Sequence, residues 1–381
     1  MMKKLNHFHF IILLLLFACP AFSQQKYVFT DTKLIQTTPV KNQYRSGTCW
    51  SFSTTSFVET ELLRMGKGEF DLSEMYPVRY TYHQRAIDYV RYQGHLNFSG
   101  GAQSWDLING ITDNGIMPEV AYHGIEYGEP NHVHGEMDEE LKSYVEAVVM
   151  NKNGQLSPVW IKGFDAILDT YLGKVPDKFD YKGVSYTPQS FAKHLDIHAE
   201  DYVSVTSFIH HPFYKLFIFE SPDNWSHERL YNLPLDELIQ TIIAAVEKGY
   251  SVQWSSDVSE KGFCNDKGVA IVPLKDWASM TDDEKQNIGT VITEEKTITP
   301  AMRQEGFDNY TTTDDHAMHI IGLATDQNGK RYFKVKNSWG TTNPYQGYFY
   351  ASEAYVRYKT MSILLNKAAI PEPIAEKLKL K

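Results

Sequence analysis

The sequence predicts an α+β protein, with helices in the first part of the chain and antiparallel strands in the last part. Three early segments are predicted to be helices: residues 49–65 from apolar residues at helical spacing, 73–92 from a candidate cap at Ser73, and 102–114, which Gly115 ends. Three late segments alternate apolar and polar residues instead, namely 316–323, 331–337 and 347–351, and Asp326-Gln327-Asn328-Gly329 predicts a hairpin turn between the first two. We therefore expect a functional site in a cleft between a helical half and a β half.

Residues 1–23 have the pattern of a signal peptide. Two lysines precede an unbroken apolar run, Phe10–Phe17, and small residues then stand before a cleavage point at Gln24. This pattern predicts a secreted or periplasmic protein whose mature domain is residues 24–381. Two alternatives remain open: the run could serve as a membrane anchor, or Cys19 could be lipidated, although bulky Phe17 fits a lipidation signal poorly. No later stretch is long and apolar enough to span a membrane.

The first predicted helix begins at a cysteine. Gly47 supplies a turn, Thr48 is a candidate N-cap, and Cys49 then falls on the first helical turn. Unpaired N–H groups and the positive end of the helix dipole both favour a thiolate at that position. The alternative is a buried, unreactive cysteine in a core helix, since free cysteine is often buried.

The middle of the chain is more mixed. Residues 128–230 are predicted to form an inserted, mostly helical region, with helices near 137–150 and 191–198 and strands near 202–206 and 214–220. A helix at 235–247 and a buried strand at 250–254 follow, and residues 278–313 are predicted to form a long surface excursion. Residues 371–381 form a short, basic C-terminal tail.

Composition excludes some classes of function. The formal net charge is −10, with no block rich in lysine and arginine, which argues against a nucleic-acid-binding protein. The chain has only three cysteines, too few for a disulfide framework. A secreted chain could pair Cys49 with Cys264, or Cys49 could remain free for chemistry.

One of the fourteen histidines has a distinctive context. His316 begins an apolar predicted strand, and His319 faces the opposite side of that strand, so only one of them can meet Cys49. We expect His316 to be the catalytic base and His319 to be structural. Asn337, at the end of the next strand, could accept the imidazole N–H and fix its tautomer, with Trp339 shielding that bond. The alternative interpretation of Asn337-Ser338-Trp339-Gly340 is a simple turn whose tryptophan packs in the core.

These residues together resemble a known family. Gln43…Cys49-Trp50, then Asp315-His316-Ala317, then Asn337-Ser338-Trp339-Gly340 are similar in order and context to the papain superfamily of cysteine peptidases. Ser46 stands where papain-like sequences have a second cysteine, and the separation between Cys49 and His316 is large. In both of these features the sequence resembles the bleomycin hydrolase and aminopeptidase C branch of the superfamily. The resemblance covers about residues 30–370 and includes Leu72-Ser73-Glu74, Gly100-Gly101-Ala102-Gln103-Ser104-Trp105-Asp106, Tyr186-Thr187-Pro188-Gln189-Ser190-Phe191 and His211-Pro212-Phe213-Tyr214-Lys215-Leu216.

The resemblance implies a papain-like two-lobed fold and specific roles. Cys49 would be the nucleophile, His316 its base, Asn337 the residue that orients His316, and Gln43 an oxyanion donor together with the backbone N–H of Cys49. The residues implied to bind peptide substrate are Gly100, Gly101 and Trp339. No metal or cofactor is implied.

The resemblance also implies cytoplasmic hexamers, in which a C-terminal tail lies in the cleft and holds the free amino terminus of the substrate. This sequence differs from that pattern in its predicted signal peptide and its short tail, residues 371–381. We therefore predict a secreted cysteine peptidase, with aminopeptidase action of the bleomycin hydrolase type as the first hypothesis. The alternatives are an endopeptidase with an open cleft and a non-catalytic peptide-binding module.

Overall fold

The computed structural model describes residues 25–380. The predicted signal peptide, residues 1–23, and Cys19 lie outside the described residues. Within the described part of the chain, no helix combines the length and the apolar character that crossing a bilayer requires.

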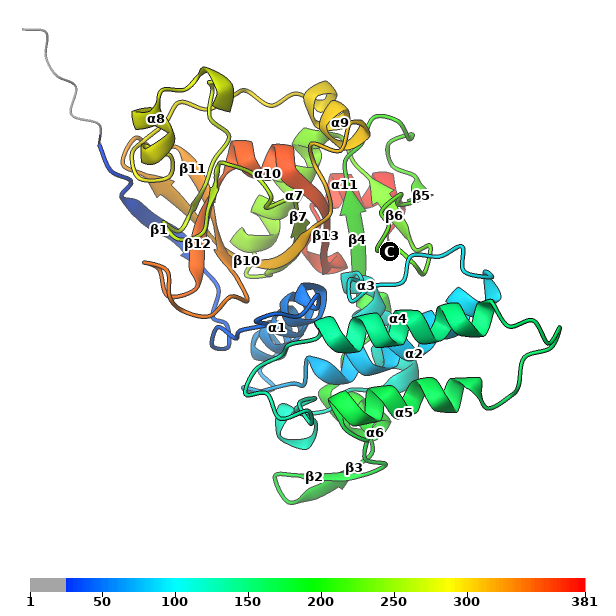
Figure 1. The fold of residues 1–381 in the computed structure, drawn as a ribbon. Helices are drawn as coiled ribbons and strands as arrows, with labels where there is room; N and C mark the ends of the chain where they lie inside the picture. Colours follow the sequence, from blue (N-terminus) through cyan, green and yellow to red (C-terminus); the bar gives the residue numbers. More distant parts are fainter. Residues whose placement is uncertain (1–24, 381) are drawn as a thin grey trace, which may run out of the picture.

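The described chain divides into a helical half and a sheet half, which confirms the predicted α+β class. Figure 1 shows α2, α4 and α5 on one side, with α1 between them and strand β10, and α7 and α10 on the sheet half. The helices of the first half are α1 (Cys49–Arg64), α2 (Met75–Arg91), α3 (Ser104–Asn114), α4 (Gly135–Val149), α5 (Trp160–Leu172) and α6 (Pro188–Leu195); α7 spans Leu235–Glu247 and α10 spans Glu353–Lys359.

The sheet half is built on one large mixed sheet. Its order is β5-β6-β4-β13-β7-β10-β11-β12-β9-β8, and β1 pairs with the second half of β10. The β4–β6 and β12–β9 pairs are parallel, and the other pairs are antiparallel. The strands are β1 (Phe29–Leu34), β4 (Tyr202–Thr206), β5 (Leu216–Ile218), β6 (Arg229–Asn232), β7 (Val252–Ser256), β8 (Phe263–Cys264), β9 (Val269–Ala270), β10 (His316–Asp326), β11 (Arg331–Lys336), β12 (Tyr348–Ser352) and β13 (Thr360–Asn366).

Residues 128–230 contribute to both halves. They form α4, α5, a small hairpin of β2 (Phe179–Tyr181) and β3 (Val184–Tyr186), and α6, and then three strands of the main sheet, β4, β5 and β6. The C-terminal segment forms α11 (Glu372–Leu378), which shares an apolar core with α7. Lys377 Nζ of α11 lies 2.7 Å from Glu237 Oε1 of α7, so this segment is fixed to the sheet half.

Helix α1 is buried because it is the layer between the two halves. Phe57 and Leu62 belong to the apolar core of the helical half, and Phe57 also packs edge-to-face against His319 of β10 and Tyr202 of β4. The first residues of α1 and β10 therefore both border the junction of the two halves.

Candidate active site

Cys49 is the first residue of α1, as the sequence predicts. Thr48 stands before it, but the Thr48 hydroxyl lies 2.6 Å from the Ser46 hydroxyl and makes no side-chain bond to the helix backbone. The helix start is therefore held by the preceding loop and not by an N-cap side chain. Cys49 and Cys264 are both free thiols, so the pairing left open by the sequence does not occur.

His316 is the first residue of β10, and its ring is held from two sides. Its Nε2 lies 2.7 Å from Asn337 Oδ1, and Trp339 covers the ring with a centroid separation of 4.5 Å. The same Oδ1 accepts the backbone N–H of Ser338 at 2.8 Å, and Asn337 Nδ2 donates to Asn265 Oδ1 at 3.2 Å. These partners identify Oδ1 as an acceptor, so Nε2 of neutral His316 carries the proton and Nδ1 carries the free lone pair.

Gln43 lies in the loop before α1 and is only 6% exposed. Its Nε2 donates to the Ser46 carbonyl at 2.9 Å, and its Oε1 accepts the Ser338 hydroxyl at 2.6 Å. Because Ser338 directly follows Asn337, the loops that carry Gln43 and Asn337 are joined by hydrogen bonds. One N–H of the Gln43 amide remains for another acceptor.

Gly100 and Gly101 form an edge beside the helix start. Trp50 Nε1 donates to the Gly100 carbonyl at 3.1 Å, which fixes this loop to α1. A Cβ at position 101 would lie 2.1 Å from Asp223 Oδ2, so only glycine allows this carboxylate to approach the edge.

A cleft with a volume of about 420 Å³ brings these groups together. Asn337 stands behind His316 and does not line it. The residues predicted from the sequence that line the cleft are Gln43, Cys49, Gly100, Gly101, His316 and Trp339.

The sequence did not predict two acidic residues that also line the cleft, Asp223 and Asp314. Asp223 Oδ1 accepts hydrogen bonds from Asn97 and Ser99, and Asp314 Oδ2 accepts one from Ser221 at 2.9 Å. Asp223 lies in the connection between β5 and β6 and had no signal in the sequence. Asp314 stands two residues before His316, so its position next to the predicted catalytic histidine was a signal in the sequence that it lies at the cleft.

Burial dominates the electrostatics of the cleft. It raises the pKa of the Cys49 thiol to about 12, against the backbone hydrogen bond of Ala317, and the Asp314 and Asp223 charges raise it further. Burial lowers the pKa of His316 to about 4, against its hydrogen bond to Asn337. The thiol and the imidazole are therefore both neutral at neutral pH in this state. Burial and the two carboxylates thus raise the pKa of the thiol at the same helix start where unpaired N–H groups favour a thiolate.

The two carboxylates are themselves perturbed. Burial raises the pKa of Asp314 to about 7, and the negative charge of Asp223 contributes in the same direction. Burial also raises the pKa of Asp223, against the positive charge of Arg85. Two neighbouring carboxylates in a partly closed site repel each other, and a bound cation would relieve that repulsion.

His319 faces away from the cleft, as predicted. Its Nδ1 lies 3.0 Å from the Ser56 hydroxyl of α1, which also accepts a hydrogen bond from Lys336 Nζ at 2.8 Å. These three side chains border a cavity of about 20 Å³, which is large enough for one water molecule. This polar contact joins α1 to β10 and β11 behind the cleft.

The cleft is lined by a cysteine at the start of α1 and by a histidine at the start of β10. This fold and this cleft place the protein among the papain-like cysteine peptidases. The Peptidase C1-like family model matches residues 170–381, and the papain family cysteine protease model matches residues 28–152. The first match covers more than half of the chain, so the chain belongs to the Peptidase C1-like family.

Sequence and structural similarity to individual proteins supports this assignment. Aminopeptidase C of Streptococcus thermophilus is 25% identical, over 86% of this chain and 80% of that protein. Aminopeptidase C of Lactobacillus delbrueckii subsp. lactis is 24% identical, over 89% of this chain and 82% of that protein. The crystal structure of PepW from Lactobacillus rhamnosis HN001 is similar in fold, with a TM-score of 0.70 and 22% identity, over 92% of this chain and 84% of that one. The resemblance to the aminopeptidase C branch and the papain-like fold are confirmed.

The predicted secreted or periplasmic location is wrong. It depended on residues 1–23, which lie outside the described residues, and the relatives are aminopeptidases of the branch that the resemblance associates with the cytoplasm. The comparisons therefore give no support to secretion.

Proposed function

We propose that this cysteine peptidase removes residues from the free amino terminus of peptides, with Cys49 as the nucleophile. The observation that carries this proposal is the composition of the cleft, in which Cys49 and His316 share one space with the carboxylates of Asp223 and Asp314. The first pair supplies acyl-transfer chemistry, and the second pair supplies negative charge for a substrate ammonium group.

In the proposed reaction, Nδ1 of His316 takes the proton of the Cys49 thiol as the sulfur attacks the peptide carbonyl. Asn337 keeps the imidazole in the tautomer that has this lone pair. The imidazolium then donates its proton to the leaving amine, and water hydrolyses the thioester by the reverse sequence.

The developing oxyanion would be bound by two N–H donors. The backbone N–H of Cys49 lies in the first turn of α1, where helical N–H groups have no partner within the helix. The remaining N–H of the Gln43 amide is the second donor. One such donor contributes about 3 kcal/mol of transition-state stabilisation.

The acidic pair favours substrates with a free amino terminus. Asp223 Oδ2 and Asp314 Oδ1 accept no hydrogen bond from residues 25–380, and both side chains line the cleft. A bound ammonium group would pair with them and cancel charges that raise the pKa of Cys49. Substrate binding would thereby make the thiolate easier to form.

Endopeptidase action is a second candidate, because the described residues of the C-terminal segment pack beside α7 and contribute no lining to the cleft. The resemblance had implied a tail in that position. An extended peptide could then cross the cleft with residues on both sides of Cys49.

Mass spectrometry of the products from one peptide, with a free or an acetylated amino terminus, tests both candidates. Stepwise loss of N-terminal residues that acetylation abolishes supports the proposal, and internal fragments from both peptides support endopeptidase action. Cys49→Ser is the control for contaminating peptidases. Absence of any product, with peptide binding unchanged in Cys49→Ser, would favour a non-catalytic peptide-binding module.

A further inference from the structure

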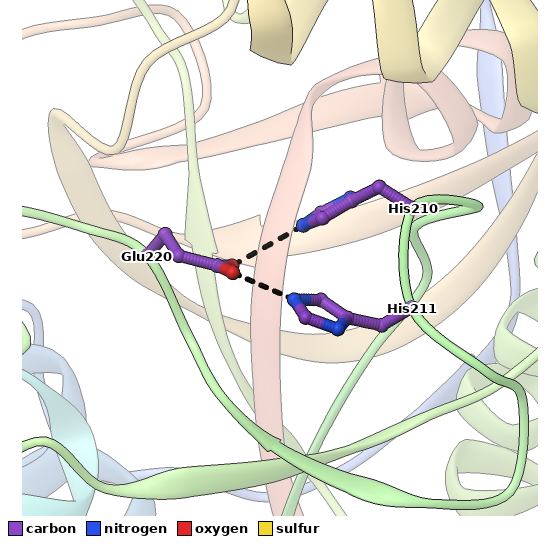
Figure 2. Close-up of side chains that lie close together, drawn as sticks. All are labelled: His210, His211 and Glu220. Carbon is purple, nitrogen blue, oxygen red and sulfur yellow. Dashed lines mark hydrogen bonds and ion pairs between the residues drawn. The ribbon is translucent and has the colours of Figure 1, made fainter.

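Two histidines and a glutamate converge outside the cleft (Figure 2). His210 and His211 lie in the connection between β4 and β5, and Glu220 lies just after β5. His210 Nε2 is 3.2 Å from Glu220 Oε2, and His211 Nε2 is 2.6 Å from Glu220 Oε1. The side chains thus point at each other from two different segments of the chain.

The hydrogen bonds behind His210 determine its tautomer. Gln304 Oε1 accepts the backbone N–H of Ile209 at 2.8 Å, and Gln304 Nε2 donates to Asp308 at 2.8 Å, so the two ends of this amide are distinguished. His210 Nδ1 lies 3.1 Å from the same Oε1 and must therefore carry a proton. In neutral His210, the Nε2 lone pair then faces a carboxylate oxygen, so a favourable contact needs either a second proton on the imidazole or a metal ion between the two atoms.

Neighbouring aromatic rings hold both imidazoles in place. His211 stacks on Phe217 with a centroid separation of 4.2 Å, and His210 stacks on Phe307 at 5.7 Å. Little side-chain freedom is left to lose on binding an ion, so the site is organised in advance. The side chains of His210 and His211 are 29% and 30% exposed, and an ion from solvent can reach them.

We infer that His210, His211 and Glu220 bind a zinc-like transition-metal ion. Two imidazole nitrogens and a carboxylate oxygen are ligands that zinc prefers, with a fourth position left for water. Ligand atoms about 2.0–2.1 Å from a tetrahedral ion lie roughly 3.3 Å apart. One ligand atom from each of the three residues can be chosen so that all lie within 4.8 Å of one another, but the two short contacts end on different oxygens of Glu220, so the side chains must adjust for one oxygen to serve the ion. Gln304 supports the site by holding Nδ1 of His210, as second-shell acceptors of metal-bound histidines do.

The ion would have a structural role near the cleft. Glu220 lines a cavity of about 390 Å³ that Asp223 and Asp314 also line. A metal held by Glu220 would join the β4–β5 connection to the segment that ends at Asp223. The consequence for substrate binding depends on the role proposed above for Asp223, but metal binding itself does not.

The test is a zinc titration of the untagged chain with Cys49 and Cys264 both replaced by serine, which removes the thiols as ligands. We expect one zinc per chain by calorimetry and by native mass spectrometry. We also expect His210→Ala, His211→Ala and Glu220→Gln each to weaken binding by at least about tenfold, and Gln304→Leu to weaken it by about ten- to a hundredfold.

His198→Ala is the matched control, since His198 is another exposed histidine in contact with a carboxylate, Asp196. Its zinc affinity should equal that of the parent. Circular dichroism checks folding, and His211→Gln replaces His211→Ala if the latter does not fold. No binding by the parent with zinc in large excess, or unchanged affinity in the variants of His210 and His211, would overturn the inference. Because these proteins lack Cys49, the result is independent of peptidase activity.

Discussion

The indole N–H of Trp50 donates a hydrogen bond to the carbonyl of Gly100, from the second residue of α1 to the loop before α3. Trp50 is 1% exposed, so water does not compete for this bond. The residue next to the nucleophile therefore fixes the distance between Cys49 and the edge on which we expect the substrate backbone to pair.

Trp50→Phe removes this donor and keeps most of the buried ring. We expect kcat/KM for peptides to fall about two- to tenfold, since one hydrogen bond contributes about 0.5–1.5 kcal/mol. The rate at which iodoacetamide alkylates Cys49 should change little, because that reagent does not use the Gly100 edge. Equal losses in both measurements would mean that the substitution disturbs the helix start itself.

Asp223→Asn should separate the reactivity of the thiol from turnover. The negative charge of Asp223 raises the pKa of Cys49, so its removal should speed alkylation of Cys49 by iodoacetamide. The same change should lower kcat/KM for substrates with a free amino terminus by about ten- to a hundredfold, because a charged contact worth about 1.5–3 kcal/mol is lost.

The control for this pair of measurements is Asp282→Asn, an exposed acidic residue at the start of α8 (Asp282–Asn287). It should leave both rates unchanged. Slower alkylation in Asp223→Asn would contradict the electrostatic account, and unchanged kcat/KM would remove Asp223 from substrate binding.

Activity should depend on pH through Asp314. Burial raises its pKa to about 7, so the carboxylate is present above that pH and is lost as the pH falls through it. We expect kcat/KM for an aminoacyl-coumarin substrate to fall below about pH 7 for this reason, and to fall again above about pH 8 as the substrate ammonium loses its proton. Asp314→Asn should flatten the acid limb relative to the parent. An unchanged acid limb in this variant would assign that limb to another group.

Asn337→Ala removes the acceptor that orients His316. We expect kcat to fall on the order of tenfold or more, because the imidazole loses its fixed tautomer and one hydrogen bond. Asn265→Ala, which removes only the partner of Asn337 Nδ2, should have a smaller effect of the same kind. Stopped-flow measurement of acylation separates this effect from later steps. If Asn265→Ala cost as much as Asn337→Ala, the effect would come from loss of loop structure and not from the imidazole.

The sequence predicted those parts of the fold that carry local signals. Helix α1 has a glycine turn before Cys49, and β10 and β11 have alternating residues with Asp326-Gln327-Asn328-Gly329 between them. Strand β13 was missed because its residues are buried on both faces, so its sequence does not alternate. Helix α5 was overlooked although its sequence carries a helical signal, since its buried residues Phe164, Leu168 and Leu172 recur every four positions.

The residues of the candidate site also divide into those that local sequence motifs predict and those that depend on the folded chain. Cys49, His316 and Asn337 stand in motifs with recognisable neighbours, and the structure brings His316 and Asn337 into a hydrogen bond as expected. Asp223 could not be found, because its place in the cleft depends on the long-range pairing of β5, β6 and β4. The neutral state of the thiol was also missed, since burial is a property of the folded chain and not of its local sequence.

The close approach of Gly101 and Asp223 limits how this protein can change over evolutionary time. A Cβ at position 101 would lie 2.1 Å from the carboxylate, so a substitution there requires the Asp223 side chain to move away from this edge or a shorter residue at 223. The two positions, 122 residues apart, should therefore vary together among related sequences. A set of such sequences would then reveal, without further structures, which members of the family keep the acidic cleft.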